Sequence, residues 1–128
     1  MLVVCPASVR ETWRAELSKL DVKAQILGPP SNKKYAEEWE YQSASKFTIV
    51  SYELVERAIS TIFAKSTPTV LIMDEAHLLK GRKAIRGEIL KYIASITPYK
   101  IALTGTPIWS RPRDFYKLLE ILHGNSVW

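Results

Sequence analysis

Five short apolar runs alternate with amphipathic stretches, and this alternation constrains the fold more than any other feature of the chain. The runs cover residues 2–5, 24–27, 47–50, 70–73 and 100–103. Each has the length of a buried strand, and the stretches between them carry apolar residues at the three- and four-residue spacing of a helix. Strand–helix repeats of this kind favour parallel strands with helices on both faces. The sequence therefore predicts one α/β domain with a mostly parallel sheet.

Helix boundaries are predicted from capping residues and apolar stripes. Ser8 and Glu11 have the S-x-x-E spacing of a capping box, which predicts that a helix begins at Ser8. An apolar stripe then places Trp13 in the core, together with Val9, Leu17 and Leu20. Further helices are predicted over residues 32–42, 54–63 and 85–96, and after Pro112, because proline suits the first turn of a helix.

Composition narrows the class of protein. The 128 residues, 47% hydrophobic and 24% charged, suit one ordinary globular domain. A lone cysteine, Cys5, excludes an internal disulfide and predicts an intracellular protein, in a prokaryotic or phage-infected cytoplasm or a eukaryotic nucleus. No apolar stretch approaches the roughly 20 residues that cross a bilayer, so no membrane partner is expected. The net charge of +5 permits a polyanionic partner, although the basic residues are scattered.

Two adjacent carboxylates, Asp74 and Glu75, directly follow the apolar run at residues 70–73, and His77 lies two residues further on. Open α/β sheets bind their ligands at the carboxyl ends of the strands. One carboxylate at such an end can hold Mg²⁺, usually through water, while its neighbour deprotonates an attacking water. His77 can then sense the γ-phosphate. These residues predict a site for a nucleotide phosphate and Mg²⁺.

Thr104, Gly105 and Thr106 follow the last apolar run and are the second candidate for this site. Parallel strands end at the same edge of a sheet, so the threonine hydroxyls are expected close to the acidic pair. There they can donate or accept hydrogen bonds with His77 and Asp74. All three residues are therefore predicted to contribute to nucleotide binding.

Residues after two other strands are candidates for contact with nucleic acid. Backbone amides at the helix start beside Pro6, Ala7 and Ser8 can bind a phosphate group, and Ser51 and Tyr52 are predicted at the same edge. Arg111 adds a basic side chain near Trp109. These residues together are the candidate nucleic-acid strip of the chain.

Several other site classes lack their residues. Two histidines and one cysteine, widely spaced, do not form a zinc site. The chain contains no G-x-S-x-G elbow and no G-x-G-x-x-G dinucleotide loop. It also contains no G-x-x-x-x-G-K-[ST] phosphate loop, so that half of a nucleotide site is expected outside these 128 residues.

Four motifs in order resemble those of the Swi/Snf-type ATPases, helicase-like DNA translocases of superfamily two. They read L-V-V-C-P-A-S-V-R-E-T-W, T-I-V-S-Y-E, L-I-M-D-E-A-H and A-L-T-G-T-P-I-W-S-R-P-R-D-F-Y-K-L-L. The resemblance implies a RecA-like, three-layer α/β/α lobe that is incomplete at both ends. Residues 1–128 would be part of a first lobe, lacking the phosphate-loop strand and the second lobe, which are expected in cis or in trans.

The same resemblance implies residue roles. Asp74 would hold Mg²⁺, Glu75 would be the catalytic base, and His77 with residues 104–106 would couple ATP hydrolysis to movement on duplex DNA. The candidate nucleic-acid strip would lie along the DNA. Since the phosphate loop and the arginine finger are not among these residues, the chain alone is predicted not to hydrolyse ATP.

Two alternative functions stay open from the sequence. The first is a fragment of a restriction-system motor subunit, which shares this lobe but couples it to a nuclease. The second is a non-catalytic relic lobe that binds DNA or a partner protein. Intact Asp74, Glu75 and Thr104 favour a catalytic lobe over a relic.

Overall fold

The computed structural model describes residues 1–40, 45–79, 84–105 and 112–123, and there strands and helices alternate as predicted. The strands are β1 (Leu2–Cys5), β2 (Ala24–Leu27), β3 (Phe47–Ser51), β4 (Val70–Met73) and β5 (Tyr99–Ala102). The helices are α1 (Arg10–Ser18), α2 (Lys33–Glu40), α3 (Val55–Lys65), α4 (Ala84–Ile96) and α5 (Pro112–His123), with short 3₁₀ turns η1 (Ala7–Val9) and η2 (Ala76–Leu79). The α/β prediction is confirmed.

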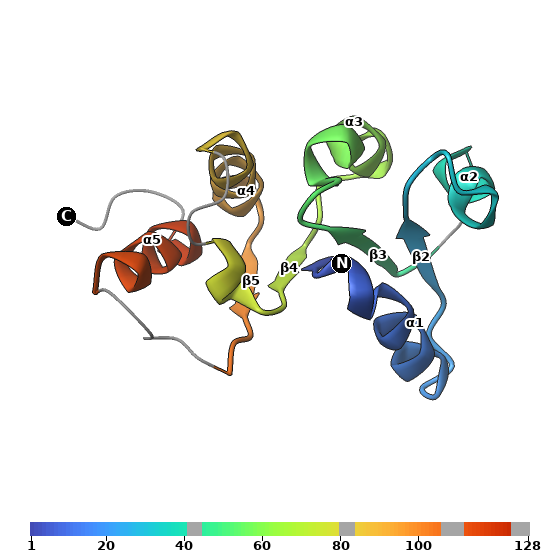
Figure 1. Cartoon of the computed structure of the whole chain (residues 1–128), viewed down its shortest axis with the longest axis horizontal. Coiled ribbons are helices and arrows are strands. Elements are labelled where there is room, and N and C mark those ends of the chain that lie inside the picture. The colour runs from blue at the N-terminus through green and yellow to red at the C-terminus, as the bar shows by residue number, and fades with distance from the viewer. Residues whose placement is uncertain (41–44, 80–83, 106–111, 124–128) are drawn as a thin grey trace.

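All of these strands lie in one parallel sheet with the order β2-β3-β1-β4-β5 (Figure 1). β1 is central, and its Val4 is aligned with Val50 of β3 on one side and with Met73 of β4 on the other. Every residue of β1 is buried, because a central parallel strand is covered on both faces. This explains why its sequence is continuously apolar.

The direction of the chain across the sheet reverses after β2. The first crossover runs from β1 to β2 at one edge, and each later crossover moves toward β5 at the other edge. Right-handed crossovers then require α1 on one face and α2, α3 and α4 on the opposite face, which is the arrangement in Figure 1. The carboxyl ends of β1 and β4 meet where the helices change face, and open sheets bind ligands at such a point.

The core has two parts, one on each face of the sheet. The larger part packs α3, α4 and α5 against the sheet through Tyr52, Leu71, Met73, Leu90 and Ile93. The smaller part lies beneath α1, where Val3, Ile26 and Ile49 are fully buried and Trp13 is partly buried. No helix in the described part of the chain is long and apolar enough to cross a bilayer.

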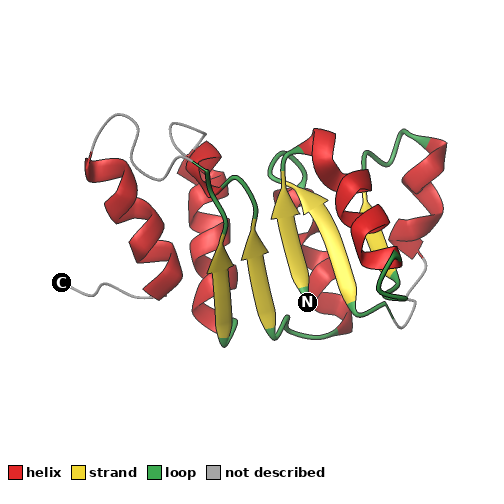
Figure 2. Cartoon of the chain, turned by 90° about the horizontal axis from the view of Figure 1, so that it is seen from below, coloured by secondary structure: helices red, strands yellow, loops and turns green. Residues whose placement is uncertain are grey.

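The two edges of the sheet differ in how they are covered. At and just after β2, side chains of α2 bond the backbone: Oε2 of Glu38 accepts from the Ile26 amide at 2.5 Å, and the Trp39 indole donates to the Gly28 carbonyl at 2.8 Å. At β5, Tyr99, Ile101 and Leu103 are 66%, 45% and 41% exposed. Figure 2 shows β4 and β5 without a covering helix on the side where α1 lies over β2 and β3.

Two details of the first helix differ from the prediction. The Ser8–Glu11 capping box is absent, because the chain makes the 3₁₀ turn η1 first and the helix start has no side-chain cap. Glu11 instead binds groups on α1 and α2. Leu20 was predicted to be buried but is 74% exposed, because α1 ends at Ser18 and the chain turns away from the sheet there.

Candidate nucleotide and metal site

The candidate site is built where β4, β1 and β5 end side by side. The Asp74 amide donates to the Val4 carbonyl of β1 at 2.8 Å, and the Leu103 amide donates to the Met73 carbonyl at 2.8 Å. The Ala76 amide then donates to the Leu103 carbonyl at 2.9 Å, which binds the turn after β4 to the end of β5. These backbone bonds bring Asp74 and Glu75 to the same edge as Thr104, as the sequence predicted.

Each polar atom of Asp74 has a hydrogen-bond partner. Its Oδ2 accepts from the indole N–H of Trp13 at 2.8 Å, and its Oδ1 accepts from the Glu75 amide at 2.9 Å. Its carbonyl oxygen accepts from the hydroxyl of Tyr52 at 2.7 Å. Both the backbone and the carboxylate of Asp74 are thereby held in place, which is a form of preorganisation that a ligand site requires.

Glu75 occupies a less common backbone conformation. Its φ angle is +50°, in the left-handed region, which costs a non-glycine residue about 1 kcal/mol or more. Its side chain is 45% exposed and its Oε2 lies 3.0 Å from Nδ1 of His77. The turn therefore presents this carboxylate to solvent at the end of the sheet, next to the fixed carboxylate of Asp74.

His77 links Glu75 to Thr104 through a single ring nitrogen. Its Nδ1 lies 3.0 Å from Oε2 of Glu75 and 3.0 Å from Oγ1 of Thr104. When Nδ1 carries a proton it can donate to both oxygens, whereas a bare Nδ1 accepts only from the threonine hydroxyl. The proton on this nitrogen thus determines whether His77 attracts Glu75. The expected His77–Thr104 contact is present, and Trp13 donates a hydrogen bond to Asp74.

The residues at this edge fit a magnesium ion bound together with a phosphate ligand. The described residues contain no group of three or more His, Cys, Asp or Glu side chains placed to hold a metal. Mg²⁺ suits such a site, because it keeps several waters and takes only one or two protein carboxylates beside substrate phosphates. The two Asp74 oxygens each keep an unused lone pair for a metal-bound water.

Cys5 ends β1 close to this site but is not a nucleophile. The thiol is buried, and burial together with the charge of Asp74 raises the pKa of Cys5 to about 12. A thiol with so high a pKa stays protonated at neutral pH. Cys5 therefore acts as a small apolar residue at the end of the central strand.

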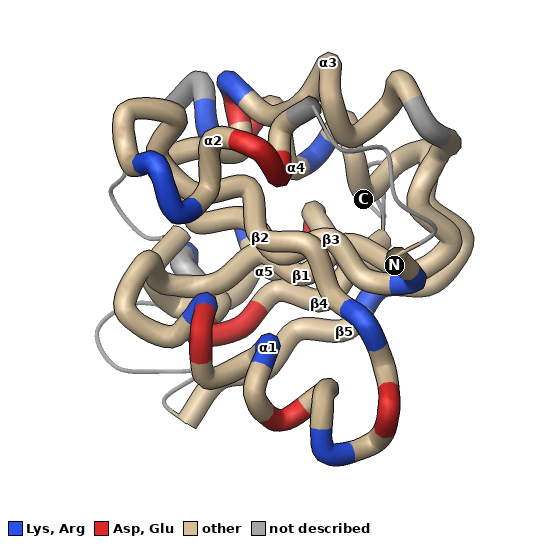
Figure 3. Tube along the Cα trace, turned by 90° about the vertical axis from the view of Figure 1, so that its right-hand side faces the viewer, with Lys and Arg blue, Asp and Glu red and all other residues tan. Residues whose placement is uncertain are grey.

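The predicted DNA strip is only partly accessible. Ala7 and Ser8 are exposed in η1, whose turn is closed by a hydrogen bond from the Val9 amide to the Pro6 carbonyl at 3.1 Å. Ser51 and Tyr52 are each 1% exposed, so their side chains face the interior. Thr106, Trp109 and Arg111 lie outside the described residues. Figure 3 shows basic and acidic positions interspersed on the side that carries α1 and α2.

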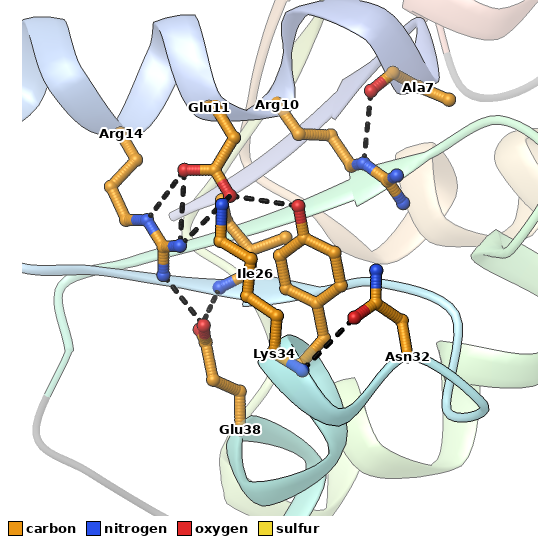
Figure 4. Close-up of polar contacts among 9 residues, drawn as sticks. Ala7, Arg10, Glu11, Arg14, Ile26, Asn32, Lys34 and Glu38 are labelled. Atoms are coloured by element: carbon orange, nitrogen blue, oxygen red, sulfur yellow. Dashed lines mark hydrogen bonds and ion pairs between the residues drawn. The ribbon is translucent and has the colours of Figure 1, made fainter.

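A polar network joins α1 to α2 beside this strip (Figure 4). Glu11 accepts hydrogen bonds from Arg14 and from the hydroxyl of Tyr35, and its Oε1 lies 2.7 Å from Nζ of Lys34. Arg14 also contacts Glu38 at 2.6 Å. Partial burial works against ionisation of Glu11, but the hydrogen bonds of Lys34 and Tyr35 and the charge of Arg14 lower its pKa to about 2. The network fixes α2 against α1.

The residue that the sequence interpretation missed is Trp13. Its apolar stripe suggested a core residue, but the indole N–H lies 2.8 Å from a carboxylate that is 61 positions away. A partly buried tryptophan usually finds a partner for its N–H. That requirement is the signal in the sequence, although it does not say which acceptor is used.

Comparison with known proteins assigns the class. The chain belongs to the SNF2-related domain family, whose profile matches residues 1–128. A solved Sulfolobus solfataricus SWI2/SNF2 ATPase core in complex with dsDNA has the same fold, with a TM-score of 0.69 and 24% identity. That match covers 98% of this chain and 24% of the solved chain. The predicted RecA-like lobe is therefore confirmed as the fold.

Curated relatives are much longer than this chain. The human DNA annealing helicase and endonuclease ZRANB3 is 31% identical over 127 residues, covering 95% of this chain and 12% of that protein. The Arabidopsis thaliana protein CHROMATIN REMODELING 19 is 31% identical over 135 residues, and the match covers 94% of this chain and 18% of that protein. The Xenopus tropicalis SWI/SNF-related matrix-associated actin-dependent regulator of chromatin subfamily A-like protein 1 is 34% identical over 116 residues. That match covers 91% of this chain and 12% of that protein.

Proposed function

We propose that the chain is part of the first motor lobe of a DNA-dependent ATPase that couples ATP hydrolysis to movement on duplex DNA. The observation that carries this proposal is that side-chain contacts join the carboxyl end of β4 to that of β5. Asp74 is fixed at the end of β4, Glu75 is presented beside it, and His77 connects Glu75 to Thr104 at the end of β5. Membership of the SNF2-related family supports the same function.

In this proposal each residue has a distinct task. Asp74 binds a magnesium-bound water, and the ion supplies charge neutralisation on the β- and γ-phosphates when it is bound. Glu75 accepts a proton from the attacking water at its carboxylate. His77 and Thr104 report the state of that carboxylate to the end of β5, and Gly105 and Thr106 complete the nucleotide contacts. The strip of Pro6, Ala7 and Ser8 lies along the DNA backbone with the main chain of residues 51–52 and with Arg111.

The phosphate loop and the second lobe are supplied by other segments, in cis or in trans. The position of β5 supports this part of the proposal, since β5 ends the described sheet and its Tyr99 and Ile101 side chains lie exposed on one face, while Glu38 and Trp39 bond backbone groups at the other end of the sheet. An exposed apolar edge strand is a template for a further strand. A strand carrying the phosphate loop would pair with the outer backbone edge of β5 and bring phosphate-binding amides beside Thr104.

A chimera tests the proposed function. Residues 1–128 replace the matched segment of the Sulfolobus solfataricus ATPase core, which supplies the remaining segments. The chimera is expected to hydrolyse ATP and to be stimulated by duplex DNA. A folded chimera that neither hydrolyses ATP nor binds duplex DNA, beside an active parent core, would contradict the proposal and favour a relic lobe.

A further inference from the structure

Trp13 lies in the crossover from β1 to β2 and touches the proposed metal-site carboxylate at the end of β4. It lies one turn into α1, and its indole N–H donates to Oδ2 of Asp74 at 2.8 Å. α1 begins directly after η1, the turn that contains Ala7 and Ser8 of the predicted DNA strip. The indole is therefore the described side-chain contact that joins the start of α1 to the end of β4.

The two carboxylate oxygens of Asp74 accept hydrogen bonds from different donors, one local in the sequence and one distant. The local donor is the neighbouring Glu75 amide, at 2.9 Å from Oδ1. A carboxylate held at one oxygen can still rotate about its χ2 torsion, which is a broad and soft one. The second donor, on a rigid indole in another element, fixes that rotation. Because the acceptor is charged, this hydrogen bond is among the stronger kinds.

We infer that Trp13 is a positioning residue that sets the orientation of the Asp74 carboxylate for its ligand. This inference rests on the proposed function for the identity of the ligand, but the positioning itself is a property of the chain alone. Replacing the indole by a phenyl ring removes the N–H while it keeps most of the apolar contact. The carboxylate then loses its distant donor, and its bond to the Glu75 amide loosens.

The chain provides a matched control in Trp39. Its indole N–H also donates at 2.8 Å and is also partly buried. The acceptor, however, is the carbonyl of Gly28, which follows the edge strand β2, and β3 and β1 lie between β2 and β4. Trp39→Phe therefore deletes an equivalent hydrogen bond that has no connection to Asp74. An effect seen in both Trp13→Phe and Trp39→Phe reflects a general loss of stability. An effect seen in Trp13→Phe alone reflects the lost hydrogen bond to the Asp74 carboxylate.

The test uses the ¹⁵N-labelled 128-residue chain without metal or nucleotide. Asp74→Ala is expected to shift the Trp13 indole resonance and to leave that of Trp39 in place. Trp13→Phe is expected to speed solvent exchange of the Glu75 amide roughly tenfold, whereas Trp39→Phe leaves it within about twofold of the original rate. Exchange is measured instead of chemical shift, since loss of an indole ring also changes ring currents.

Two results would overturn the inference. An indole resonance of Trp13 that ignores Asp74→Ala would show that the contact does not form. Equal exchange of the Glu75 amide in the two Phe variants would show that Trp13 does not orient the carboxylate. ATP hydrolysis by the core chimera addresses the proposed function separately, because the exchange measurement uses neither metal nor nucleotide and its outcome does not depend on hydrolysis.

Discussion

Nδ1 of His77 lies 3.0 Å from Oγ1 of Thr104, so a side-chain hydrogen bond joins the turn after β4 to the end of β5 across 27 positions of sequence. The same nitrogen contacts the carboxylate of Glu75 at 3.0 Å. A change at the Glu75 carboxylate thus reaches Thr104 through one imidazole. This connection is the physical basis of the proposed coupling between hydrolysis and DNA.

Removal of the Thr104 hydroxyl should uncouple ATP hydrolysis from its stimulation by duplex DNA. Thr104→Val deletes the hydroxyl that bonds His77 at a partly buried site, so unfolding free energy is expected to fall by about 1 kcal/mol. In the core chimera, stimulation of ATPase activity by duplex DNA should fall roughly fivefold or more while the unstimulated rate stays similar. Thr97→Val is the control, because its hydroxyl bonds the Ile93 carbonyl away from the site. Equal loss of stimulation in both variants would contradict the coupling role.

The chain alone should bind ATP weakly and should not hydrolyse it. Its described residues offer carboxylates and hydroxyls to a nucleotide, whereas the phosphate loop and arginine finger of the proposed motor come from other segments. Isothermal titration with MgATP should give a dissociation constant above about 1 mM, a binding energy weaker than about 4 kcal/mol. Hydrolysis by the isolated chain that disappears in Glu75→Gln would contradict this expectation.

Acid should weaken the α1–α2 network. The folded-state pKa of Glu11 is lowered to about 2 from an ordinary value near 4.5, so its contribution to stability is complete above pH 4.5 and is lost as the pH falls toward 2. Because the side chain is 43% exposed, solvent screening limits that contribution to about 1 kcal/mol.

Urea unfolding of the original chain and of Glu11→Gln measures this effect. Their difference in unfolding free energy should be present at pH 7 and should shrink between pH 4.5 and pH 2. Glu16→Gln is a suitable control, since its pair with Lys19 is well exposed and should contribute little at any pH. A difference that does not depend on pH would argue against the ionised network.

Substitution by alanine should change the stability of the chain in opposite directions at two glycines. A Cβ on Gly28 would overlap the ring of Tyr35, so Gly28→Ala is expected to displace that ring from Glu11 and to cost about 2 kcal/mol. Gly87 lies in α4 with nothing within 4 Å of a Cβ, so Gly87→Ala should stabilise the chain by about 0.5–1 kcal/mol. Thermal unfolding of both variants checks the signs, and a stabilising Gly28→Ala would contradict the packing of Tyr35 on β2.

The open side of β5 should make the isolated chain self-associate. Tyr99 and Ile101 are exposed on β5, which pairs with β4 and has no second neighbouring strand among the described residues, so the substitutions Tyr99→Lys and Ile101→Lys together are expected to reduce association in sedimentation velocity runs. Leu20→Lys is the control, because Leu20 is more exposed but lies in the turn after α1. A chain that is monomeric at about 100 μM without any substitution would remove this support for a missing strand.

The sequence predicted the strands better than the contacts between them. The order of elements follows from local apolar periodicity, and for this reason β1, β4 and α3 lie where they were expected. The capping box failed because Glu11 finds stronger partners in Lys34 and Tyr35, more than twenty positions away. The bond from Trp13 to Asp74 has the same character, since its geometry exists only once the fold has brought the two elements together.

The most direct test of the central claim is ATP hydrolysis by the core chimera with Glu75 intact and with Glu75→Gln. If Glu75 is the base for the attacking water, the substitution should lower kcat by roughly 100-fold or more and leave the KM for ATP within a few-fold. The isosteric amide preserves the size of the side chain, so folding and nucleotide binding serve as internal controls. A Glu75→Gln chimera that hydrolyses ATP at a rate close to that of the unsubstituted chimera would contradict the assignment of this site.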